Sequence, residues 1–187
     1  MHLLVLSPIS FINGVTPFQS GFVTFCATWI PNITIVWVLI FLYFRPIPNK
    51  CVFAPFENPR IRTLQLVIIM FSALAARFFA VILKNYFHIG RPFLLNNGLH
   101  PIIALTDYGF PSAHAAVFSA IAAALFLINR RAGIFAGLLA LVIGAARIFA
   151  GVHTPLDIIG GYILGTLIAI CVDFLAQIYQ KKIIETV

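Results

Sequence analysis

Long apolar stretches alternate with short polar ones along this chain of 187 residues. A helix that crosses the hydrocarbon core of a bilayer needs about 20 mainly apolar residues. Five stretches fit this requirement and predict membrane-spanning helices at roughly 21–44, 64–83, 113–129, 133–150 and 158–179. Pro31 is expected to kink the first helix. Gly160, Gly161 and Gly165 should allow the fifth to approach another helix closely.

The first nineteen residues, MHLLVLSPISFINGVTPFQ, are apolar but interrupted by Pro8, Gly14 and Pro17. They lack the positively charged start of a signal peptide. We expect an interfacial segment that lies on the membrane, with a re-entrant turn as the alternative. The expected fold is therefore all-α. It is a polytopic membrane helix bundle of about five transmembrane helices plus this N-terminal segment, forming a single domain over 1–187.

Composition agrees with a membrane protein, because 61% of the residues are hydrophobic and 9% are charged, whereas soluble domains are about 25% charged. The net charge is +7, but no basic run exceeds two residues. Membrane topology therefore explains the excess of basic residues better than nucleic-acid binding does. Three scattered cysteines, Cys26, Cys51 and Cys171, indicate neither a disulfide framework nor a metal cluster.

The basic residues predict the orientation of the chain in the membrane. They cluster in three regions: the loop 45–62, the turn at 130–131 and the tail at 181–182. Five spans place these regions on one side, which the positive-inside rule makes cytoplasmic. We therefore expect a multi-pass protein of the inner (cytoplasmic) membrane, with the loops 84–112 and 151–157 facing the periplasm or the cell exterior.

Three polar stretches fall on that outward face: KNYFHIGRP (84–92), PSAH (111–114) and ARIFAGVHTPLD (146–157). Their spacings, K-x6-R-P, P-S-x-H and R-x5-H-x3-D, resemble the three-part signature of the type-2 phosphatidic acid phosphatase superfamily. Its members include bacterial lipid phosphatases and vanadium haloperoxidases. Two positions depart from the usual signature: Ala113 stands where Gly is usual, and Ala146 where Ser is usual. Neither departure removes a charge or a proton carrier.

The residue types in these stretches suit phosphoryl transfer. That reaction needs the phosphate oxygens held, a nucleophile in line and a proton for the leaving group. Lys84, Arg91 and Arg147 supply positive charge, and an arginine can grip two oxygens at once. Ser112 suits the N-cap of the helix that follows it. Its hydroxyl and the first helical N–H groups, that of Ala113 included, would then form an anion site.

His153 and Asp157 are expected to work together. Thr154 can be an N-cap, Pro155 suits the first helical position, and Asp157 falls at the third. The carboxylate could then hold one ring N–H of His153 and leave the other nitrogen free to attack. The resemblance implies that His153 is the nucleophile, with a phosphohistidine intermediate, and that His114 is the general acid. It implies no metal or other cofactor, because Lys and Arg take the electrostatic role.

Each of these residues also has an ordinary explanation when taken alone. Asp157 could only complete a capping box, Ser112 could be a plain N-cap, and the histidines could be interfacial polar residues. Lys84 and Arg91 could be interfacial anchors. Together, these residues would have to match the spacing of one family by coincidence, so we favour the functional interpretation.

Two other charged residues lie outside the three motifs. Arg77 falls inside the second predicted span, seven residues before Lys84 and roughly 10 Å deeper. We expect it to pair with an acid, or to add positive potential below the site. Asp107 is the one acid in the outward loop 84–112. We expect it to have a turn role before Gly109 rather than a catalytic one.

The apolar loop PFLLNNGLHPIIAL (92–105) suits the headgroup region of a membrane and favours a substrate that enters sideways from the bilayer. We therefore predict a phosphatase acting on a lipid-linked phosphate monoester or diphosphate at the outward face. The resemblance to bacterial undecaprenyl-diphosphate phosphatases makes undecaprenyl diphosphate the first candidate. Phosphatidylglycerophosphate, phosphatidate, the 1-phosphate of lipid A and phosphotransfer between lipids are alternatives. From other classes, a haloperoxidase or an inactive lipid-binding scaffold are further alternatives.

Overall fold

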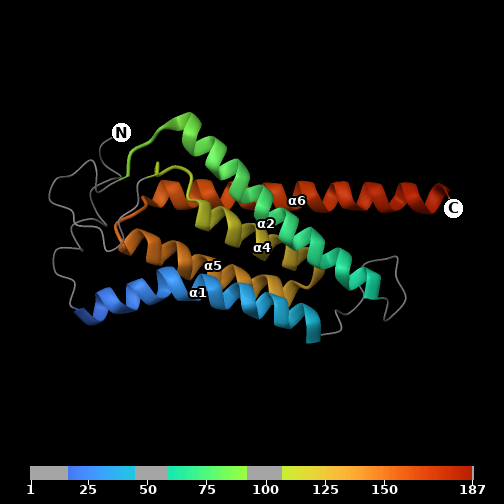
Figure 1. Ribbon diagram of the computed structural model, residues 1–187, viewed down its shortest axis with the longest axis horizontal. Helices are drawn as coiled ribbons and strands as arrows, with labels where there is room; N and C mark the ends of the chain where they lie inside the picture. Colours follow the sequence, from blue (N-terminus) through green and yellow to red (C-terminus); the bar gives the residue numbers. More distant parts are fainter. Residues whose placement is uncertain (1–16, 45–58, 92–106, 187) are drawn as a thin grey trace.

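The computed structural model describes residues 17–44, 59–91 and 107–186 of the chain (Figure 1). These residues form five α-helices: α1 (Pro17–Phe44), α2 (Pro59–Phe87), α4 (Ala113–Ile128), α5 (Arg130–Phe149) and α6 (Pro155–Thr186). No strand occurs among the described residues. Four of the helices are long and apolar enough to cross a membrane, and α4 is a shorter apolar helix of 16 residues. The expected all-α polytopic bundle is therefore confirmed.

Successive helices run in opposite directions, as Figure 1 shows. The end of α2, the start of α4, the end of α5 and the start of α6 consequently meet at one end of the bundle. All three polar motifs of the sequence belong to these helix ends or to the segments that join them. The up-and-down topology thus brings together motifs that are far apart along the chain.

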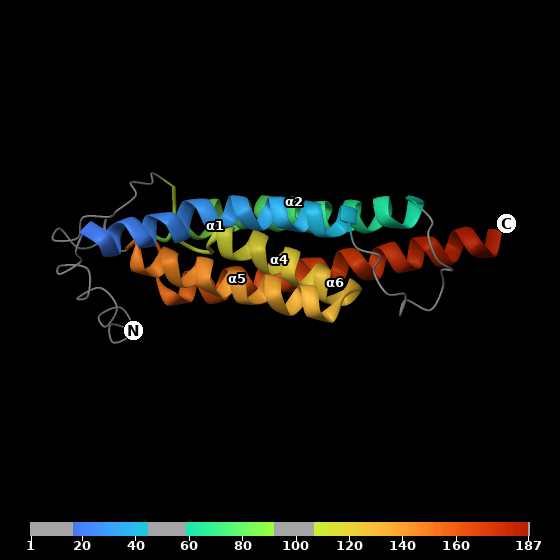
Figure 2. The same ribbon diagram turned by 90° about the horizontal axis from the view of Figure 1, so that it is seen from below.

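Helix α4 is the centre of the bundle, because it packs against α2, α5 and α6, while α1 packs mainly on α5. Figure 2 shows α4 between α2 on one side and α5 and α6 on the other. Much of the interior is alanine, including the buried residues Ala76, Ala80, Ala116, Ala120 and Ala136. Small side chains let helix backbones approach closely, which is how helices associate where lipid removes the hydrophobic driving force.

The glycines of α6 pack directly against α4, as expected from the sequence. A Cβ atom at Gly165 would lie 2.0 Å from the carbonyl oxygen of Ala116, and one at Gly161 would lie 2.6 Å from that of Ser112. Real side chains do not approach a backbone so closely. The absence of a side chain at both positions therefore lets α6 lie against the first half of α4.

Helices α2 and α6 extend beyond the predicted spans at both ends, and α1 and α5 begin earlier than predicted. Apolarity marks only the hydrocarbon core, whereas backbone hydrogen bonding can continue through the headgroup region. One prediction is corrected here: Pro17 begins α1, so the last three residues of the proposed interfacial segment are helical. The rest of that segment, the loop 92–105 and Cys51 lie outside the described residues. Pro31 lies inside α1, which continues on both sides of it.

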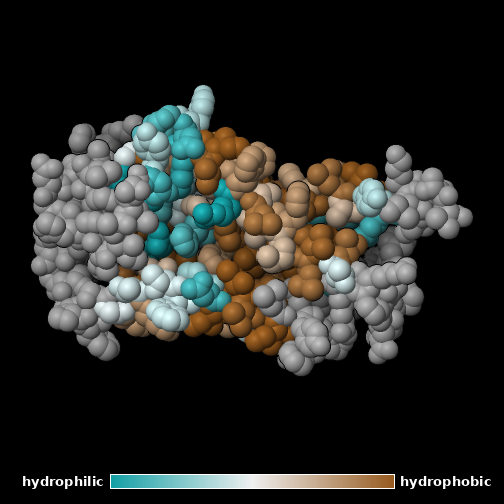
Figure 3. Space-filling view, viewed as in Figure 1, coloured by the Kyte–Doolittle hydropathy of each residue, from teal (hydrophilic) through white to brown (hydrophobic). Residues whose placement is uncertain are grey.

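The outer surface of the bundle suits a bilayer. Large apolar side chains such as Phe71, Leu74 and Phe78 are more than half exposed, and apolar surface of this extent is rare on soluble monomers. Figure 3 shows hydrophobic residues across the middle of one face, with hydrophilic residues gathered toward the end where α4 and α6 begin. The protein is therefore a multi-pass membrane protein with a polar region at one end of the bundle.

Candidate active site

The first motif places two buried cations at the end of α2. Lys84 lies in the last turn of the helix and Arg91 follows in the extended segment after it. Their relative exposures are 4% and 1%. A cation near the C-terminus of a helix is favoured by the helix dipole. The burial of two cations, however, needs nearby acceptors and negative charge.

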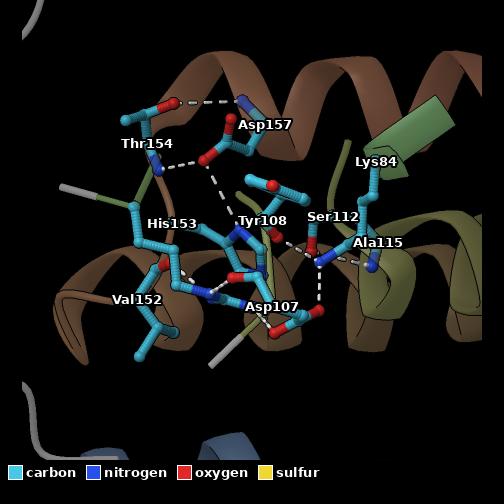
Figure 4. Close-up of polar contacts among 10 residues, drawn as sticks. Lys84, Asp107, Tyr108, Ser112, Ala115, Val152, His153, Thr154 and Asp157 are labelled. Atoms are coloured by element: carbon cyan, nitrogen blue, oxygen red, sulfur yellow. Dashed lines mark hydrogen bonds and ion pairs between the residues drawn. The ribbon is translucent and has the colours of Figure 1, made fainter. Parts of the chain in front are cut away.

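The segment before α4 supplies those acceptors (Figure 4). The Nζ of Lys84 donates to Oδ2 of Asp107 and to the carbonyl oxygen of Tyr108, both at 2.6 Å. Arg91 donates from Nε to the carbonyl oxygen of Asp107 at 2.7 Å, and from Nη2 to its Oδ1. Nη1 of Arg91 donates to the carbonyl oxygen of Val152 at 2.8 Å. The two cations thereby join the segments that precede α4 and α6.

The role of Asp107 differs from the turn role expected from the sequence. Burial raises the pKa of its carboxyl, but the hydrogen bonds and charges of Lys84 and Arg91 outweigh this and lower the pKa to about 2. The carboxylate is therefore ionised at any physiological pH. A signal for this role was present in the sequence, because Asp107 is the one acid in a loop that carries two of the motif cations.

The second motif forms the start of α4, as predicted. Ser112 is the N-cap, and its Oγ accepts the N–H of Ala115 at 3.5 Å. The backbone N–H of Ser112 donates to the carbonyl oxygen of Asp157 at 2.9 Å, which ties this turn to α6. Ala113 is the first helical residue. The first N–H groups of a helix lack acceptors within the helix and carry the positive end of its dipole, so they favour an anion.

The third motif joins α5 to α6 and holds a buried His–Asp pair. Nδ1 of His153 lies 3.4 Å from Oδ2 of Asp157, and both residues are 3% exposed. An ionised carboxylate can only accept, so Nδ1 carries the hydrogen and Nε2 of the neutral ring keeps its lone pair. The same Oδ2 accepts the N–H of Thr154 at 2.7 Å, and Oγ1 of Thr154 accepts the N–H of Asp157 at 3.2 Å. The predicted capping box is therefore present together with the His–Asp pair.

The environment of His153 keeps its imidazole neutral. Burial is the largest effect on its pKa, the hydrogen bond to Asp157 opposes burial only in part, and the positive charges of Arg91 and Arg147 add to it. Together these effects lower the pKa to about 4. A neutral imidazole with its Nδ1 hydrogen held by a carboxylate is the form that can act as a nucleophile through Nε2.

Arg147 lies in the last turn of α5 and is 5% exposed. Its buried Nε has no hydrogen-bond partner among the described residues. Buried donors are nearly always paired, so an unpaired one indicates a missing acceptor such as a ligand oxygen. The neighbouring Ala146, which stands where the family usually has Ser, packs against Cys26 and Ala27 of α1. A small apolar side chain suits that contact.

His114, the second residue of α4, is half-buried and lies within electrostatic range of Lys84, Arg147 and His153. The structure thus brings together all eight residues predicted for the site: Lys84, Arg91, Ser112, Ala113, His114, Arg147, His153 and Asp157. Arg77 also acts electrostatically on His114. Its side chain is exposed, and the acid expected to pair with it is not found among the described residues.

The charges of this cluster favour an anionic ligand. Lys84, Arg91 and Arg147 contribute three positive charges, and the carboxylates of Asp107 and Asp157 contribute two negative ones. A buried excess of positive charge is costly unless an anion offsets it. Within the part of the chain that the structure describes, no group of three or more His, Cys, Asp or Glu residues could hold a metal ion. The three basic side chains and the N–H groups at the start of α4 suit the binding of an oxyanion.

Comparison with protein families gives a match to the PAP2 superfamily over residues 65–183. One relative is YbjG of Escherichia coli (strain K12), which is provisionally named an undecaprenyl-diphosphatase. The two sequences are 32% identical over 123 residues, which are 65% of this chain and 62% of YbjG. Phosphatidylglycerophosphatase B of Bacillus subtilis (strain 168) is 30% identical over 113 residues, covering 54% of this chain and 51% of that protein. The chain spans less than two thirds of the length of the curated relatives that it matches.

The fold is similar to that of a protein whose structure has been solved. The crystal structure of Aquifex aeolicus LpxE superimposes with a TM-score of 0.67 over 88% of this chain and 91% of that chain, at 24% sequence identity. This similarity concerns the arrangement of the helices. It extends over nearly the whole of both chains, so the bundle around the site is a shared architecture.

Proposed function

This chain belongs to the PAP2 superfamily, and from that membership we propose that it is a membrane phosphatase acting on a lipid-linked phosphate monoester or diphosphate. The observation that carries the proposal is the buried Arg147, whose Nε lacks a partner among the described residues, beside the buried His153–Asp157 pair. A phosphoryl group needs a hydrogen-bond donor for its oxygens and a nucleophile directed at its phosphorus. The unpaired Nε of Arg147 and the oriented imidazole of His153 would provide these two interactions.

The reaction follows from the assigned roles. Lys84, Arg91, Arg147 and the start of α4 hold the phosphate oxygens. Nε2 of His153 attacks phosphorus, a P–N bond forms, and the bond from phosphorus to the leaving oxygen breaks as His114 protonates that oxygen. Water then attacks the phosphohistidine, with His114 accepting its proton. Orthophosphate is released and both histidines return to their starting forms. Asp157 holds the Nδ1 hydrogen of His153 throughout.

Undecaprenyl diphosphate is the substrate that we propose first. YbjG carries a provisional assignment to that reaction, and the site lies at the end of a bundle whose outer surface suits lipid. The leaving group would then be undecaprenyl phosphate. The excess of basic residues at the opposite end of the bundle supports an active site on the outward face of the inner membrane. The substrate is lipid-soluble, so it can reach the site from within the bilayer.

The test is phosphate release by the purified full chain in detergent, measured on one panel of lipids. The panel contains undecaprenyl diphosphate, undecaprenyl phosphate, phosphatidylglycerophosphate, phosphatidate and lipid A 1-phosphate. We expect the highest kcat/KM on undecaprenyl diphosphate, no loss of activity in excess chelator, and no release by His153→Ala. A higher kcat/KM on phosphatidylglycerophosphate would make that lipid the substrate, while the proposed phosphatase reaction would still hold. Release from none of the lipids by a folded protein would instead favour an inactive lipid-binding scaffold.

A further inference from the structure

Asp107 places a negative charge within the proposed phosphate site, and both of its carboxylate oxygens are in use. Oδ2 accepts from Lys84 at 2.6 Å, and Oδ1 accepts from Arg91. A bound phosphate would require N–H groups of the same two cations. We propose that the Asp107 carboxylate is a displaceable counter-ion that competes with phosphate for Lys84 and Arg91, and thereby limits how tightly the site holds its product. This inference rests on the proposed function.

The number of available donors supports competition. A lysine ammonium has three N–H groups and an arginine guanidinium five. Lys84 directs two of these to Asp107 and Tyr108, and Arg91 directs three to Asp107 and Val152. One N–H of Lys84 and two of Arg91 then remain for a ligand. Movement of the carboxylate would free one more on each cation, so a phosphate that displaces it would gain two hydrogen bonds.

The carboxylate can move without loss of the surrounding structure. Main-chain atoms anchor this segment independently: the carbonyl oxygens of Asp107 and Tyr108 accept from Arg91 and Lys84, and Gly109 donates to Ile89 at 2.8 Å. The Asp107 side chain is 56% exposed, whereas those of Lys84 and Arg91 are 5% and 1% exposed. Rotation of the Asp107 side chain into solvent would therefore leave both cations in place.

Protonation does not release this counter-ion under physiological conditions, because its pKa is held at about 2 by Lys84 and Arg91 against the opposing effect of burial. Displacement therefore requires a competing anion. A carboxylate that stays near a bound phosphate also repels it, since like charges a few Å apart interact unfavourably. Both effects weaken phosphate binding, so removal of the charge should strengthen it. A residue that only positioned the two cations would have the opposite effect.

The experiment measures the dissociation constant of inorganic phosphate, and the inhibition constant of vanadate, for the purified full chain in detergent. Asp107→Asn keeps the shape of the side chain and removes its charge. We expect it to bind both anions about tenfold more tightly, which corresponds to ~1.4 kcal/mol. Asp107→Glu restores the charge and should return both constants toward wild type. Asp173→Asn is the matched control. It removes an acid from α6 that is bonded only to Gln177 among the described residues, and it should change neither constant.

Weaker binding of phosphate by Asp107→Asn would overturn the proposal and make Asp107 a positioning residue. If the variant is too unstable to assay in isolation, its melting temperature with and without phosphate gives the same answer. A larger rise than in wild type supports competition, and a smaller one contradicts it. The proposed function fails separately, through the lipid panel. If Asp107→Asn binds phosphate more tightly but the wild type hydrolyses no lipid, the counter-ion proposal is supported and the proposed phosphatase function is wrong.

Discussion

His153 donates its Nδ1 hydrogen to Oδ2 of Asp157 across 3.4 Å, and the same oxygen accepts the backbone N–H of Thr154 at 2.7 Å. One carboxylate oxygen therefore both orients the imidazole and caps the start of α6. The sequence left open whether Asp157 was a helix-capping residue or part of the site. The structure contains both interactions, because the histidine directly precedes the N-cap of the helix.

Asp157→Asn should separate these two roles. The amide oxygen can still accept the N–H of Thr154, so we expect the melting temperature to change little. The imidazole, however, loses its negative partner and its fixed orientation. By analogy with other carboxylate–histidine pairs, kcat should fall by about 10²–10⁴-fold. Thr154→Ala is the control, since it removes only the hydroxyl that caps Asp157, at a cost of ~1 kcal/mol of stability. Equal losses of kcat in both variants would show that the helix start, and not the carboxylate, matters.

The pH dependence of kcat/KM should report the neutral state of His153 in the free enzyme. Its pKa is lowered from the usual 6.5 to about 4, chiefly by burial. The neutral, nucleophilic form then persists well below the usual range and is lost only as the pH falls through about 4. The free energy of unfolding should also decrease as the pH falls, because the unfolded chain, in which His153 has its usual pKa, binds the proton more readily. The measurement is kcat/KM across the acidic range, since kcat/KM reports the ionisations of the free enzyme. An acid limb centred near 6.5 would contradict a buried neutral imidazole.

Close contact between α4 and α6 predicts that Gly165 tolerates no side chain. Its Cβ would lie 2.0 Å from the carbonyl oxygen of Ala116 and 2.2 Å from Oγ of Ser119. Gly165→Ala should therefore push the two helices apart and lower the free energy of unfolding by about 1–3 kcal/mol. Gly137→Ala is the matched control, because a Cβ there meets nothing within 4 Å. A thermal unfolding curve that shows equal stability for the two variants would contradict this packing.

Much of the bundle could be predicted from the sequence, because a membrane imposes one simple rule on every span. The length of each apolar stretch was enough to predict all five helices. The glycines of α6 correctly indicated a close contact with another helix. Ser112 and Thr154 were recognisable as N-caps from their places before apolar helices. These signals are local, so neighbouring residues are enough to interpret them.

The bridging role of Asp107 could not be predicted in the same way. Its two partners, Lys84 and Arg91, are 23 and 16 residues earlier in the chain, and only the antiparallel arrangement of α2 and α4 brings them to it. A local interpretation of the Asp before a Gly favoured a turn. Arg77 was similarly ambiguous, because apolar periodicity does not indicate whether an intramembrane charge faces a partner.

Orientation in the membrane can be tested through the cysteines. Cys51 lies in the basic loop that the positive-inside rule places in the cytoplasm, whereas Cys26 and Cys171 lie in α1 and α6. A membrane-impermeant thiol reagent should therefore fail to label Cys51 in intact cells and should label it after lysis, with Cys51→Ser as the blank. Labelling in sealed cells would reverse the orientation and move the proposed chemistry to the cytoplasmic face.

The two histidines should respond differently to substitution if their roles are those proposed. His153→Ala removes the atom that bonds to phosphorus, so turnover should be abolished on every substrate while the protein stays folded. His114→Ala keeps the nucleophile but removes the proton for the leaving oxygen, and general acid catalysis is worth ~10²–10⁴-fold. The loss of rate should be largest when the leaving group is a lipid alcohol, which needs a proton to depart. It should shrink for p-nitrophenyl phosphate, whose phenolate leaves readily without a proton.

Activity is therefore compared on a lipid monoester and on p-nitrophenyl phosphate for both variants. The ratio of the two rates should shift toward p-nitrophenyl phosphate in His114→Ala. Quenching without acid, with labelled substrate, should trap phosphate on wild type and never on His153→Ala, because the P–N bond needs Nε2 of that residue. His114→Ala should still trap phosphate from the activated ester, since its nucleophile and the His153–Asp157 pair are intact. Trapped phosphate on His153→Ala, or equal losses on both substrates for His114→Ala, would mean that the two roles are assigned to the wrong residues.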